Sequence, residues 1–413
     1  MKEIKRNLYL NRLINRRENS LIKIITGIRR CGKSYLLNNI FYNYLLNNGI
    51  KDNHIIKIAL DNDEFSELRG EGNLSKYVKN KIKDDKMYYI LLDEIQLAEN
   101  FEFALNGLNS IENTDIYVTG SNSKFLSSDI ITEFRGRGDE VRLLPLSFSE
   151  FSSAYDGTIE EAWDEYVTYG GLPLILSQKT PEQKSNYLTN LFKTTYIKDI
   201  VDRNKIQRTD ILDALINSIA SSIGSLTNPN KLFNTFISNG EKEVSVNTIV
   251  TYLDLLLDAF MIEKAERYDV KGKKYIGALS KYYFSDVGLR NARINFRQLE
   301  ENHIMENIIY NELIMRGFNV DVGIVEVRDN GNRKQLEVDF VCNLGSKRYY
   351  IQSALNLDTR EKTLQEENSL ININDNFKKI IIVKNSHKPW YTEEGVLVIG
   401  IKDFLLNQNS LDL

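Results

Sequence analysis

The segment Leu21-Ile-Lys-Ile-Ile25, followed one residue later by Gly27-Ile-Arg-Arg-Cys-Gly-Lys-Ser34, decides how the first third of this chain folds. The apolar run from Leu21 to Ile25 predicts a buried strand. A helix is expected from about Lys33, because apolar residues then recur on one face until Asn47-Asn-Gly49 ends the pattern. The eight residues that join strand and helix match the pattern Gly-x-x-x-x-Gly-Lys-Ser/Thr, which is typical of a phosphate-binding loop.

This loop predicts ATP as a ligand, with Mg²⁺. Its glycines let backbone N–H groups point inward, and the amino terminus of the helix favours anionic oxygens. Lys33 is expected to reach the terminal phosphates and Ser34 to ligate Mg²⁺. A chance match in a glycine loop is the alternative, which the strand, loop and helix context disfavours. The residues expected to contact the nucleotide are Gly27, Ile28, Arg29, Arg30, Cys31, Gly32, Lys33, Ser34 and Tyr35.

A second apolar run, Tyr88-Tyr-Ile-Leu-Leu92, delivers Asp93 and Glu94 at its carboxyl end, where an open α/β sheet places its ligands. Asp93 is predicted to hold Mg²⁺ together with Ser34, and Glu94 to polarise the attacking water. Hydrolysis is therefore expected to depend on Glu94 and Lys33. The simpler alternative is an acidic strand end that is exposed to solvent.

Two further polar stretches are candidates for the catalytic site. Thr119-Gly-Ser-Asn122 ends a third strand, and Asn122 would face the γ-phosphate or the attacking water; a turn of small residues is an equally weighted alternative. Glu133-Phe-Arg-Gly-Arg-Gly-Asp139 contributes Arg135 and Arg137 as candidate arginine fingers, acting within the chain or from a neighbouring subunit. Arg137 is slightly favoured. Solvated arginines or structural salt bridges are the alternative.

The order of the patterns predicts an α/β protein of three domains. Short apolar runs alternate with helical patterns, so residues 1–150 are expected to form a parallel-sheet domain. Residues 148–263 read mostly as helices, so residues 151–295 are expected to form a second, helical domain. Strand-like runs recur from Val320 after a helix at Glu306–Met315, so residues 296–413 are expected to form a second α/β domain. Further strands of the first domain are predicted at His54–Leu60, Met87–Leu92, Asp115–Thr119 and Glu140–Leu144.

Composition adds little about partners and more about compartment. The 413 residues include 53 basic and 57 acidic ones, and the net charge of -4 points to no class of partner. Only Cys31 and Cys342 occur, outside any Cys-x-x-Cys context, which disfavours a disulfide framework or a structural zinc site. The first residues do not resemble a secretory signal, and no run of about 18 apolar residues is present. We therefore expect a cytoplasmic protein without a membrane span.

Taken together, these motifs resemble the AAA-like P-loop ATPases that carry a carboxyl-terminal DUF4143 domain, over nearly the whole chain. The resemblance implies an ATPase that uses a glutamate next to its magnesium-binding aspartate. It also implies a helical lid and winged-helix region over 151–295 and a restriction-endonuclease-like fold over 296–413. The stretches that carry it are Thr26–Ser34, Leu92-Asp-Glu-Ile-Gln96, Thr119–Asn122, Arg135-Gly-Arg137, Leu144-Pro-Leu-Ser-Phe-Ser-Glu-Phe151 and Tyr169-Gly-Gly-Leu-Pro173.

The winged-helix candidate is the stretch Glu243–Ile262, followed by strand-like Glu263–Tyr268 and Lys274–Ile276. A helix followed by a basic hairpin could enter a DNA groove. Between Glu263 and Lys281 there are six basic and three acidic residues, a net of +3. This excess is mild, and such folds also pack against other domains, so DNA and an unknown protein both remain candidate partners.

The restriction-like resemblance implies a metal-dependent nuclease site, and the sequence argues that this site is degenerate. Glu337-Val-Asp339 supplies a carboxylate strand, and Glu306 could add a carboxylate from a helix. On the next strand, however, Gln352 stands where an acid is expected and Ala354 where a lysine is expected. An amide does not replace the charge of a carboxylate toward Mg²⁺, so we expect no nuclease activity unless Glu306 or Glu366 completes the site.

These observations favour an ATPase whose nucleotide cycle moves its helical and carboxyl-terminal domains. The alternative is a nucleotide-gated adaptor that binds DNA or a protein with negligible turnover. An arginine finger supplied by a neighbouring subunit would require a homo-oligomer.

Overall fold

The computed structural model describes residues 4–120, 136–238, 240, 244–297, 300–329, 332–385 and 388–413. These residues form two compact units. The amino-terminal unit runs to Pro145 and includes Asp258–Phe260. The carboxyl-terminal unit comprises Leu146–Leu257 and Met261–Leu413. Each unit has its own sheet and is described separately below.

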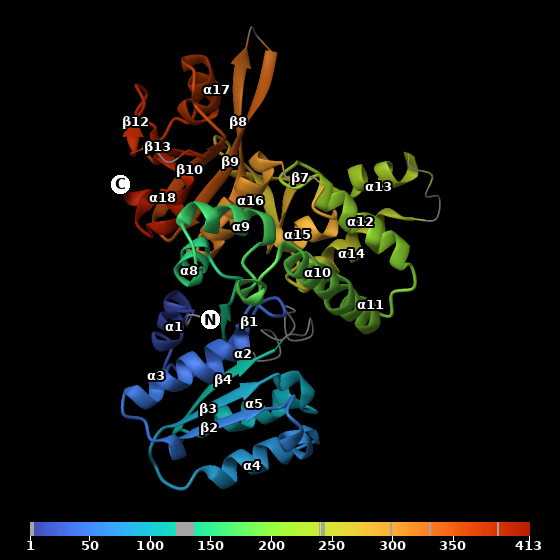
Figure 1. Ribbon diagram of the computed structural model, residues 1–413, viewed down its shortest axis with the longest axis vertical. Helices are drawn as coiled ribbons and strands as arrows, with labels where there is room; N and C mark the ends of the chain where they lie inside the picture. Colours follow the sequence, from blue (N-terminus) through green and yellow to red (C-terminus); the bar gives the residue numbers. More distant parts are fainter. Residues whose placement is uncertain are drawn as a thin grey trace. The chain divides into compact units, whose positions relative to one another are not determined.

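The amino-terminal unit is built on a sheet of five parallel strands in the order β2-β3-β4-β1-β5 (Figure 1). This confirms the predicted parallel sheet. Strands β1 and β3 are buried along their whole length, as their unbroken apolar runs require. The last strand begins two residues earlier than predicted, because its half-exposed edge position gives only a weak apolar signal. The strands are β1 (Ile22–Thr26), β2 (Ile55–Ala59), β3 (Tyr88–Asp93), β4 (Thr114–Thr119) and β5 (Gly138–Arg142).

Helices cover both faces of this sheet. On one face, α4 (Asn73–Lys81) and α5 (Phe101–Asn109) pack against apolar side chains of β1 to β4. On the other face, the ring of Phe41 lies 4.5 Å from that of Tyr117 on β4. Phe41 belongs to the predicted helix after the loop, which consists of α2 (Lys33–Tyr35), a π-helical segment (Leu36–Phe41) and α3 (Tyr42–Asn47). A further helix, α1 (Asn7–Ile14), precedes β1.

An ion pair is buried within this sheet. The Lys23 ammonium of β1 contacts the Asp115 carboxylate of β4, and both side chains are almost fully buried. Asp115 also accepts hydrogen bonds from the backbone N–H of Glu18 at 3.1 Å and from the Tyr117 hydroxyl at 2.8 Å. Lys23, the one charged residue of β1, is therefore paired with Asp115 on the neighbouring strand β4.

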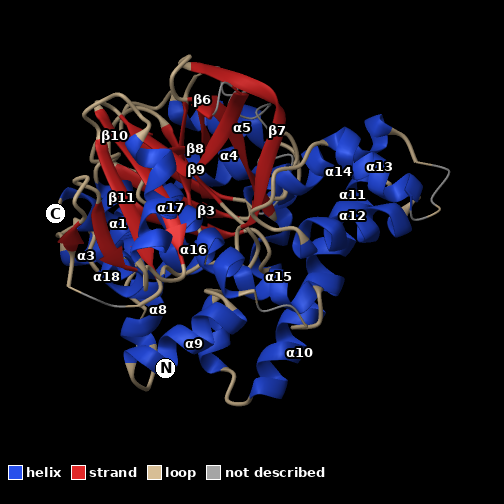
Figure 2. Ribbon diagram, turned by 90° about the horizontal axis from the view of Figure 1, so that it is seen from above, coloured by secondary structure: helices blue, strands red, loops and turns tan. Residues whose placement is uncertain are grey.

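The carboxyl-terminal unit contains a mixed sheet of eight strands in the order β12-β13-β11-β10-β9-β8-β6-β7. Figure 2 draws its strands in red, with α16 and α17 beside them. The hairpin of β6 and β7 pairs with β8 through Arg267–Asp269, so a residue boundary at 295 falls inside this sheet. The strands are β6 (Ile262–Asp269), β7 (Lys274–Phe284), β8 (Asn319–Asp329), β9 (Asn332–Leu344), β10 (Lys347–Ala354), β11 (Lys378–Val383), β12 (Trp390–Tyr391) and β13 (Leu397–Gly400).

Most helices of this unit precede the sheet in the chain, which agrees with the helical pattern predicted after Pro145. They are α8 (Phe148–Ala154), α9 (Ile159–Tyr169), α10 (Pro181–Leu191), α11 (Lys198–Asn204), α12 (Thr209–Ser221), α13 (Pro229–Ser238) and α14 (Val246–Asp258). The others are α15 (Val287–Arg293), α16 (Glu301–Met315), α17 (Arg360–Ile371) and α18 (Ile401–Leu406). A π-helical segment, Phe192–Ile197, joins α10 to α11.

The motif Tyr169-Gly-Gly-Leu-Pro173 is explained by a buried carboxylate. Asp286, at the start of α15, accepts hydrogen bonds from the backbone N–H groups of Gly171 at 2.7 Å and Leu289 at 3.0 Å. Gly170 has a φ of 74°, and a Cβ there would lie 2.2 Å from the Asp286 carboxylate. Only glycine allows the chain to approach this carboxylate so closely.

This carboxylate should make the stability of the carboxyl-terminal unit depend on pH. Burial raises the pKa of Asp286 from 3.8 to about 6. Since the folded state holds the proton more tightly, its contribution is complete below the unfolded pKa and is lost as the pH rises through the folded pKa. Relative to Asp286→Asn, we expect the wild-type free energy of unfolding to fall by about 3 kcal/mol between about pH 4 and pH 7.

Denaturant unfolding followed by tryptophan fluorescence would measure this difference, because Trp163 and Trp390 are the only tryptophans and both lie in the carboxyl-terminal unit. A difference between the two proteins that stays constant across this pH range would contradict the prediction.

Candidate functional site

The loop between β1 and α2 has the backbone geometry that its glycines predict. Gly27 and Gly32 have φ values of 135° and 104°, and Arg30 also adopts a positive φ of 65°. A Cβ at Gly27 would lie 2.1 Å from the backbone oxygen of Leu143, so no side chain fits there. The Arg6 guanidinium donates to the carbonyl oxygens of Cys31 at 3.4 Å and Leu144 at 2.7 Å. Arg6, which the sequence did not suggest, thus ties the loop to the segment after β5.

Lys33 lies in the first turn of the helix and is buried. Its ammonium donates to the carbonyl oxygens of Gly27 at 2.8 Å and Ile28 at 3.0 Å. The side chain therefore folds back along the loop and holds a positive charge against it. This is the position from which a lysine can reach phosphate oxygens held by the same loop.

Asp93 ends β3 and is the centre of a polar cluster beside the loop. Its carboxylate accepts hydrogen bonds from the Ser34 hydroxyl at 3.1 Å, the Asn38 amide at 3.0 Å and the Thr119 hydroxyl. Burial raises the pKa of Asp93, while the hydrogen bonds from Thr119 and Ser34 act in the opposite direction. The structure thus brings the two predicted magnesium ligands, Ser34 and Asp93, into direct contact.

Strand order explains this cluster. Because β4 lies between β1 and β3, its last residue, Thr119, sits between the loop and Asp93. The sequence singled out the stretch Thr119–Asn122 but selected Asn122 from it and not Thr119, and it gave no reason to select Asn38. Asn38 lies one helical turn after Ser34, so the same face of the helix carries both residues.

Glu94 follows Asp93 in a left-handed conformation with a φ of 53°. Its backbone N–H donates to the Thr119 hydroxyl at 3.1 Å, and its carboxylate accepts a hydrogen bond from the Gln96 amide. Thr119 therefore contacts both acidic residues. A non-glycine residue in this conformation is uncommon and costs free energy, which its neighbours must offset.

The remaining loop residues differ in exposure. Ile28 and Cys31 are buried, Arg29 is half-buried, and Arg30 and Tyr35 are exposed. The Cys31 side chain lies under the loop, where its sulfur would be 3.2 Å from a Cβ built on Gly27. Ile28 and Cys31 can therefore face a nucleotide only through their backbone groups, whereas Arg30 and Tyr35 have side chains free to reach solvent.

The structure places Arg137 far from the loop. Its carbonyl oxygen accepts a hydrogen bond from Ile22, at the start of β1, and its side chain is exposed. The loop follows the other end of β1, five residues later, which corresponds to about 15 Å of strand. Within one chain, Arg137 is thus at the opposite end of the sheet from Lys33. The predicted residues Asn122 and Arg135 lie outside the described residues.

The donor set beside the loop fits a nucleotide with Mg²⁺. Mg²⁺ prefers oxygen ligands, and the Ser34 hydroxyl and the Asp93 carboxylate are adjacent oxygen groups at the first turn of the helix. The loop itself can provide backbone N–H groups and the Lys33 ammonium for phosphate oxygens. The cradle is narrow enough that only glycine fits at position 27.

The predicted basic hairpin exposes less positive charge than the sequence suggests. Of its six basic residues, Arg267 and Lys281 are buried, and Lys264 is paired with Glu266 at 2.7 Å. The other three basic residues, Lys271, Lys273 and Lys274, lie at the turn and are exposed. The preceding helix α14 contains no lysine or arginine. The net charge of +3 counted along the sequence therefore overstates the positive surface.

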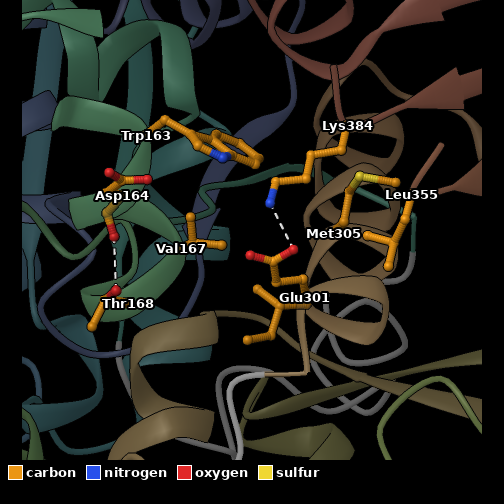
Figure 3. A pocket seen from close by; sticks show the side chains of 9 residues that line it. Trp163, Asp164, Val167, Thr168, Glu301, Met305, Leu355 and Lys384 are labelled. Carbon is orange, nitrogen blue, oxygen red and sulfur yellow. Dashed lines mark hydrogen bonds and ion pairs between the residues drawn. The ribbon is translucent and has the colours of Figure 1, made fainter. Parts of the chain in front are cut away.

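A cavity of about 250 Å³ lies between α9 and α16 in the carboxyl-terminal unit. Figure 3 shows the Trp163 ring on one side of this cavity, with Met305 and Leu355 across from it. Lys384 and Glu301 form an ion pair of 2.6 Å at the same cavity. Its walls are mainly apolar.

Comparison with protein families identifies the class of the amino-terminal unit. Residues 19–152 match the family described as AAA domain. With its parallel sheet and phosphate-binding loop, the unit has a P-loop ATPase-like fold. Residues 160–300 match a different family from the expected one, the domain of unknown function DUF8612. The expectation of a DUF4143 domain was therefore wrong, because the motifs that suggested it lie largely in the ATPase-like part of the chain.

Two relatives place the whole chain. An uncharacterized protein of Haemophilus influenzae is 34% identical over 410 residues, which cover 98% of this chain and 98% of that protein. An uncharacterized protein of Methanocaldococcus jannaschii is 31% identical over 363 residues, covering 83% of this chain and 76% of that protein. The chain belongs to the family that these two proteins represent.

Solved structures resemble the chain only distantly. The Aeropyrum pernix ORC1 protein in complex with DNA matches with a TM-score of 0.27 and 12% identity. The match covers 71% of this chain and 93% of the ORC1 chain. A DNA polymerase III gamma subunit-related protein from Thermotoga maritima has a TM-score of 0.25 and 13% identity over 60% of this chain and 97% of that one.

Among the described residues, no helix is long and apolar enough to cross a membrane.

Proposed function

We propose that the amino-terminal unit binds ATP with Mg²⁺ and hydrolyses it. The observation that carries this proposal is the Asp93 carboxylate, which accepts hydrogen bonds from Ser34, Asn38 and Thr119 directly beside the phosphate-binding loop. Three side chains from two segments, the helix after the loop and the end of β4, converge on one acid at the end of a buried strand. A solvent-exposed acidic strand end, the simpler alternative, would have no such partners.

Each residue has a role that follows from its position. Ser34 and Asp93 would hold Mg²⁺, which supplies positive charge that stabilises the phosphate oxygens during transfer. Lys33 binds the terminal phosphate oxygens, and the loop residues Gly27 to Tyr35 surround the phosphates through their backbone N–H groups. Glu94, anchored through its backbone to Thr119, accepts a proton from the attacking water.

In this proposal the candidate arginine fingers act between the subunits of a homo-oligomer. Since Arg137 lies at the opposite end of β1 from the loop, it would act on the nucleotide of a neighbouring subunit in a homo-oligomer. Arg135 would act in the same way, and Asn122 would face the γ-phosphate within the chain.

The cycle is proposed to move the rest of the protein. In this proposal residues 1–150 are the ATPase domain, residues 151–295 a helical lid with a winged-helix region, and residues 296–413 a restriction-endonuclease-like domain. A nucleotide-gated adaptor with negligible turnover is the second candidate. The absence of basic residues on α14 and the burial of Arg267 and Lys281 favour a protein over DNA as its partner.

Replacing Lys33 by alanine should weaken ATP binding by about tenfold or more, since charge-assisted hydrogen bonds contribute roughly 1.5–3 kcal/mol. Titration of a fluorescent ATP analogue in the presence of Mg²⁺ would measure the dissociation constant. Lys76→Ala, on an exposed position of α4, is the matched control and should bind as the wild type does. A folded Lys33→Ala protein with unchanged affinity would overturn the role given to this lysine.

A further inference from the structure

A second cavity, of about 400 Å³, lies in the carboxyl-terminal unit and is rich in charged groups. Its walls come from β7, α16, β9, β10 and α17. The cavity contains Glu306, Glu337 and Asp339, the acidic residues that the sequence suggested for a degenerate nuclease-like site. In the structure, Glu306 of α16 and Asp339 of β9 accept hydrogen bonds from the same ammonium group. The sequence also placed a missing lysine at Ala354, and here the structure changes the interpretation.

A lysine is present in this cavity, and it comes from a different strand. The Lys281 ammonium of β7 lies 2.7 Å from Glu306, 2.8 Å from Glu337 and 3.2 Å from Asp339. The ammonium donates hydrogen bonds to Glu306 and Asp339 and forms an ion pair with Glu337. Lys281 is only 2% exposed, so its charge depends on these partners.

The surroundings hold the carboxylates in this arrangement. The Tyr283 hydroxyl donates to Glu306 at 2.6 Å, and the backbone N–H of Ser353 donates to Asp339 at 2.9 Å. Burial alone would lower the pKa of Lys281, but Asp339, Glu306 and Glu337 together raise it above its usual range. The ammonium and its three acids therefore form one connected cluster of ion pairs across β7, α16 and β9.

This geometry does not fit the divalent metal that a restriction-like site implies. Mg²⁺ sits about 2.0–2.1 Å from its oxygen ligands, and larger divalent cations at only slightly greater distances. A metal bound by Glu306, Glu337 and Asp339 would need the position that the Lys281 nitrogen holds. In keeping with this, no group of three or more His, Cys, Asp or Glu side chains in the described part of the chain is arranged to hold a metal.

We propose that Lys281 is the resident cation of this cavity, in place of a divalent metal, so that the native protein binds no Mg²⁺ or Mn²⁺ at Glu306, Glu337 and Asp339. The cluster is a structural clamp that joins the β6–β7 hairpin to α16 and β9.

Mn²⁺ binding measured by electron paramagnetic resonance on the nucleotide-free protein tests the proposal. The wild type and Asp339→Asn should bind Mn²⁺ equally, since Asp339 holds no metal. Mn²⁺ binding by the wild type that is lost in Asp339→Asn but kept in Asp93→Ala would overturn the proposal. This comparison is independent of ATP, so it stands whether or not the amino-terminal unit hydrolyses nucleotide.

A second arm removes the internal cation. Lys281→Met keeps much of the side-chain volume and leaves three carboxylates facing one another, so it should gain Mn²⁺ affinity by at least about tenfold. The gain should disappear in Lys281→Met combined with Asp339→Asn. A folded Lys281→Met protein that binds Mn²⁺ no better than the wild type would contradict the assignment. If this variant does not fold, the comparison of the wild type with Asp339→Asn still decides the question.

Discussion

Glu94→Gln should lower the rate of ATP hydrolysis by at least about a hundredfold and leave ATP binding nearly unchanged, because a general base contributes about 10²–10⁴ in rate. Glutamine keeps the shape of the side chain and its contact with Gln96, and the backbone bond to Thr119 does not depend on the side chain. What is lost is the group that accepts a proton from water. Phosphate release at saturating ATP measures the rate, and titration of a fluorescent ATP analogue measures binding.

The matched control is Glu99→Gln, which makes the same chemical change at an exposed position five residues later. It should hydrolyse ATP at the wild-type rate. Equal rates for Glu94→Gln and the wild type would remove Glu94 from the mechanism. Absence of turnover in the wild type, with ATP binding intact, would favour the adaptor instead.

Lys23→Ala should destabilise the amino-terminal unit by about 3–5 kcal/mol, the cost of leaving one partner of a buried ion pair uncompensated. Asp115 would keep its hydrogen bonds from Glu18 and Tyr117 but lose its only buried counter-charge among the contacts described above. Hydrogen exchange of the backbone amides of β4 measures the effect in this unit, since both tryptophans lie in the other one.

We expect the lost charge, and not the lost side-chain volume, to cause the destabilisation by Lys23→Ala. A double variant separates these two causes. Lys23→Met combined with Asp115→Asn removes both charges and retains similar shapes, so it should be less destabilised than Lys23→Ala. Lys76→Ala on the surface of α4 should leave exchange in β4 unchanged. If Lys23→Ala lowers the free energy of unfolding by less than about 1 kcal/mol, the Lys23–Asp115 ion pair contributes no more than an exposed ion pair does.

The sequence was sufficient to predict the structure where the residues that contact one another are also close in the chain. The loop from Gly27 to Ser34, its flanking strand and helix, and the buried strand that ends at Asp93 all follow local periodicity. The edge strand β5 was less well placed, because a half-exposed strand has a weaker pattern. The DUF4143 assignment failed for a related reason: the shared motifs were mostly local features of the ATPase-like unit.

By itself, then, the sequence determined the phosphate-binding loop and the order of strands and helices around it, since backbone conformation and apolar periodicity are encoded over a few residues. Only the tertiary structure decided which side chains from distant segments meet. Strand order puts Thr119 between Lys33 and Asp93, and parallel register puts Arg137 at the far end of the same sheet. The pairing of β6 with β8 brings Lys281 to carboxylates that no spacing in the sequence connects to it, because long-range contacts depend on how strands pair.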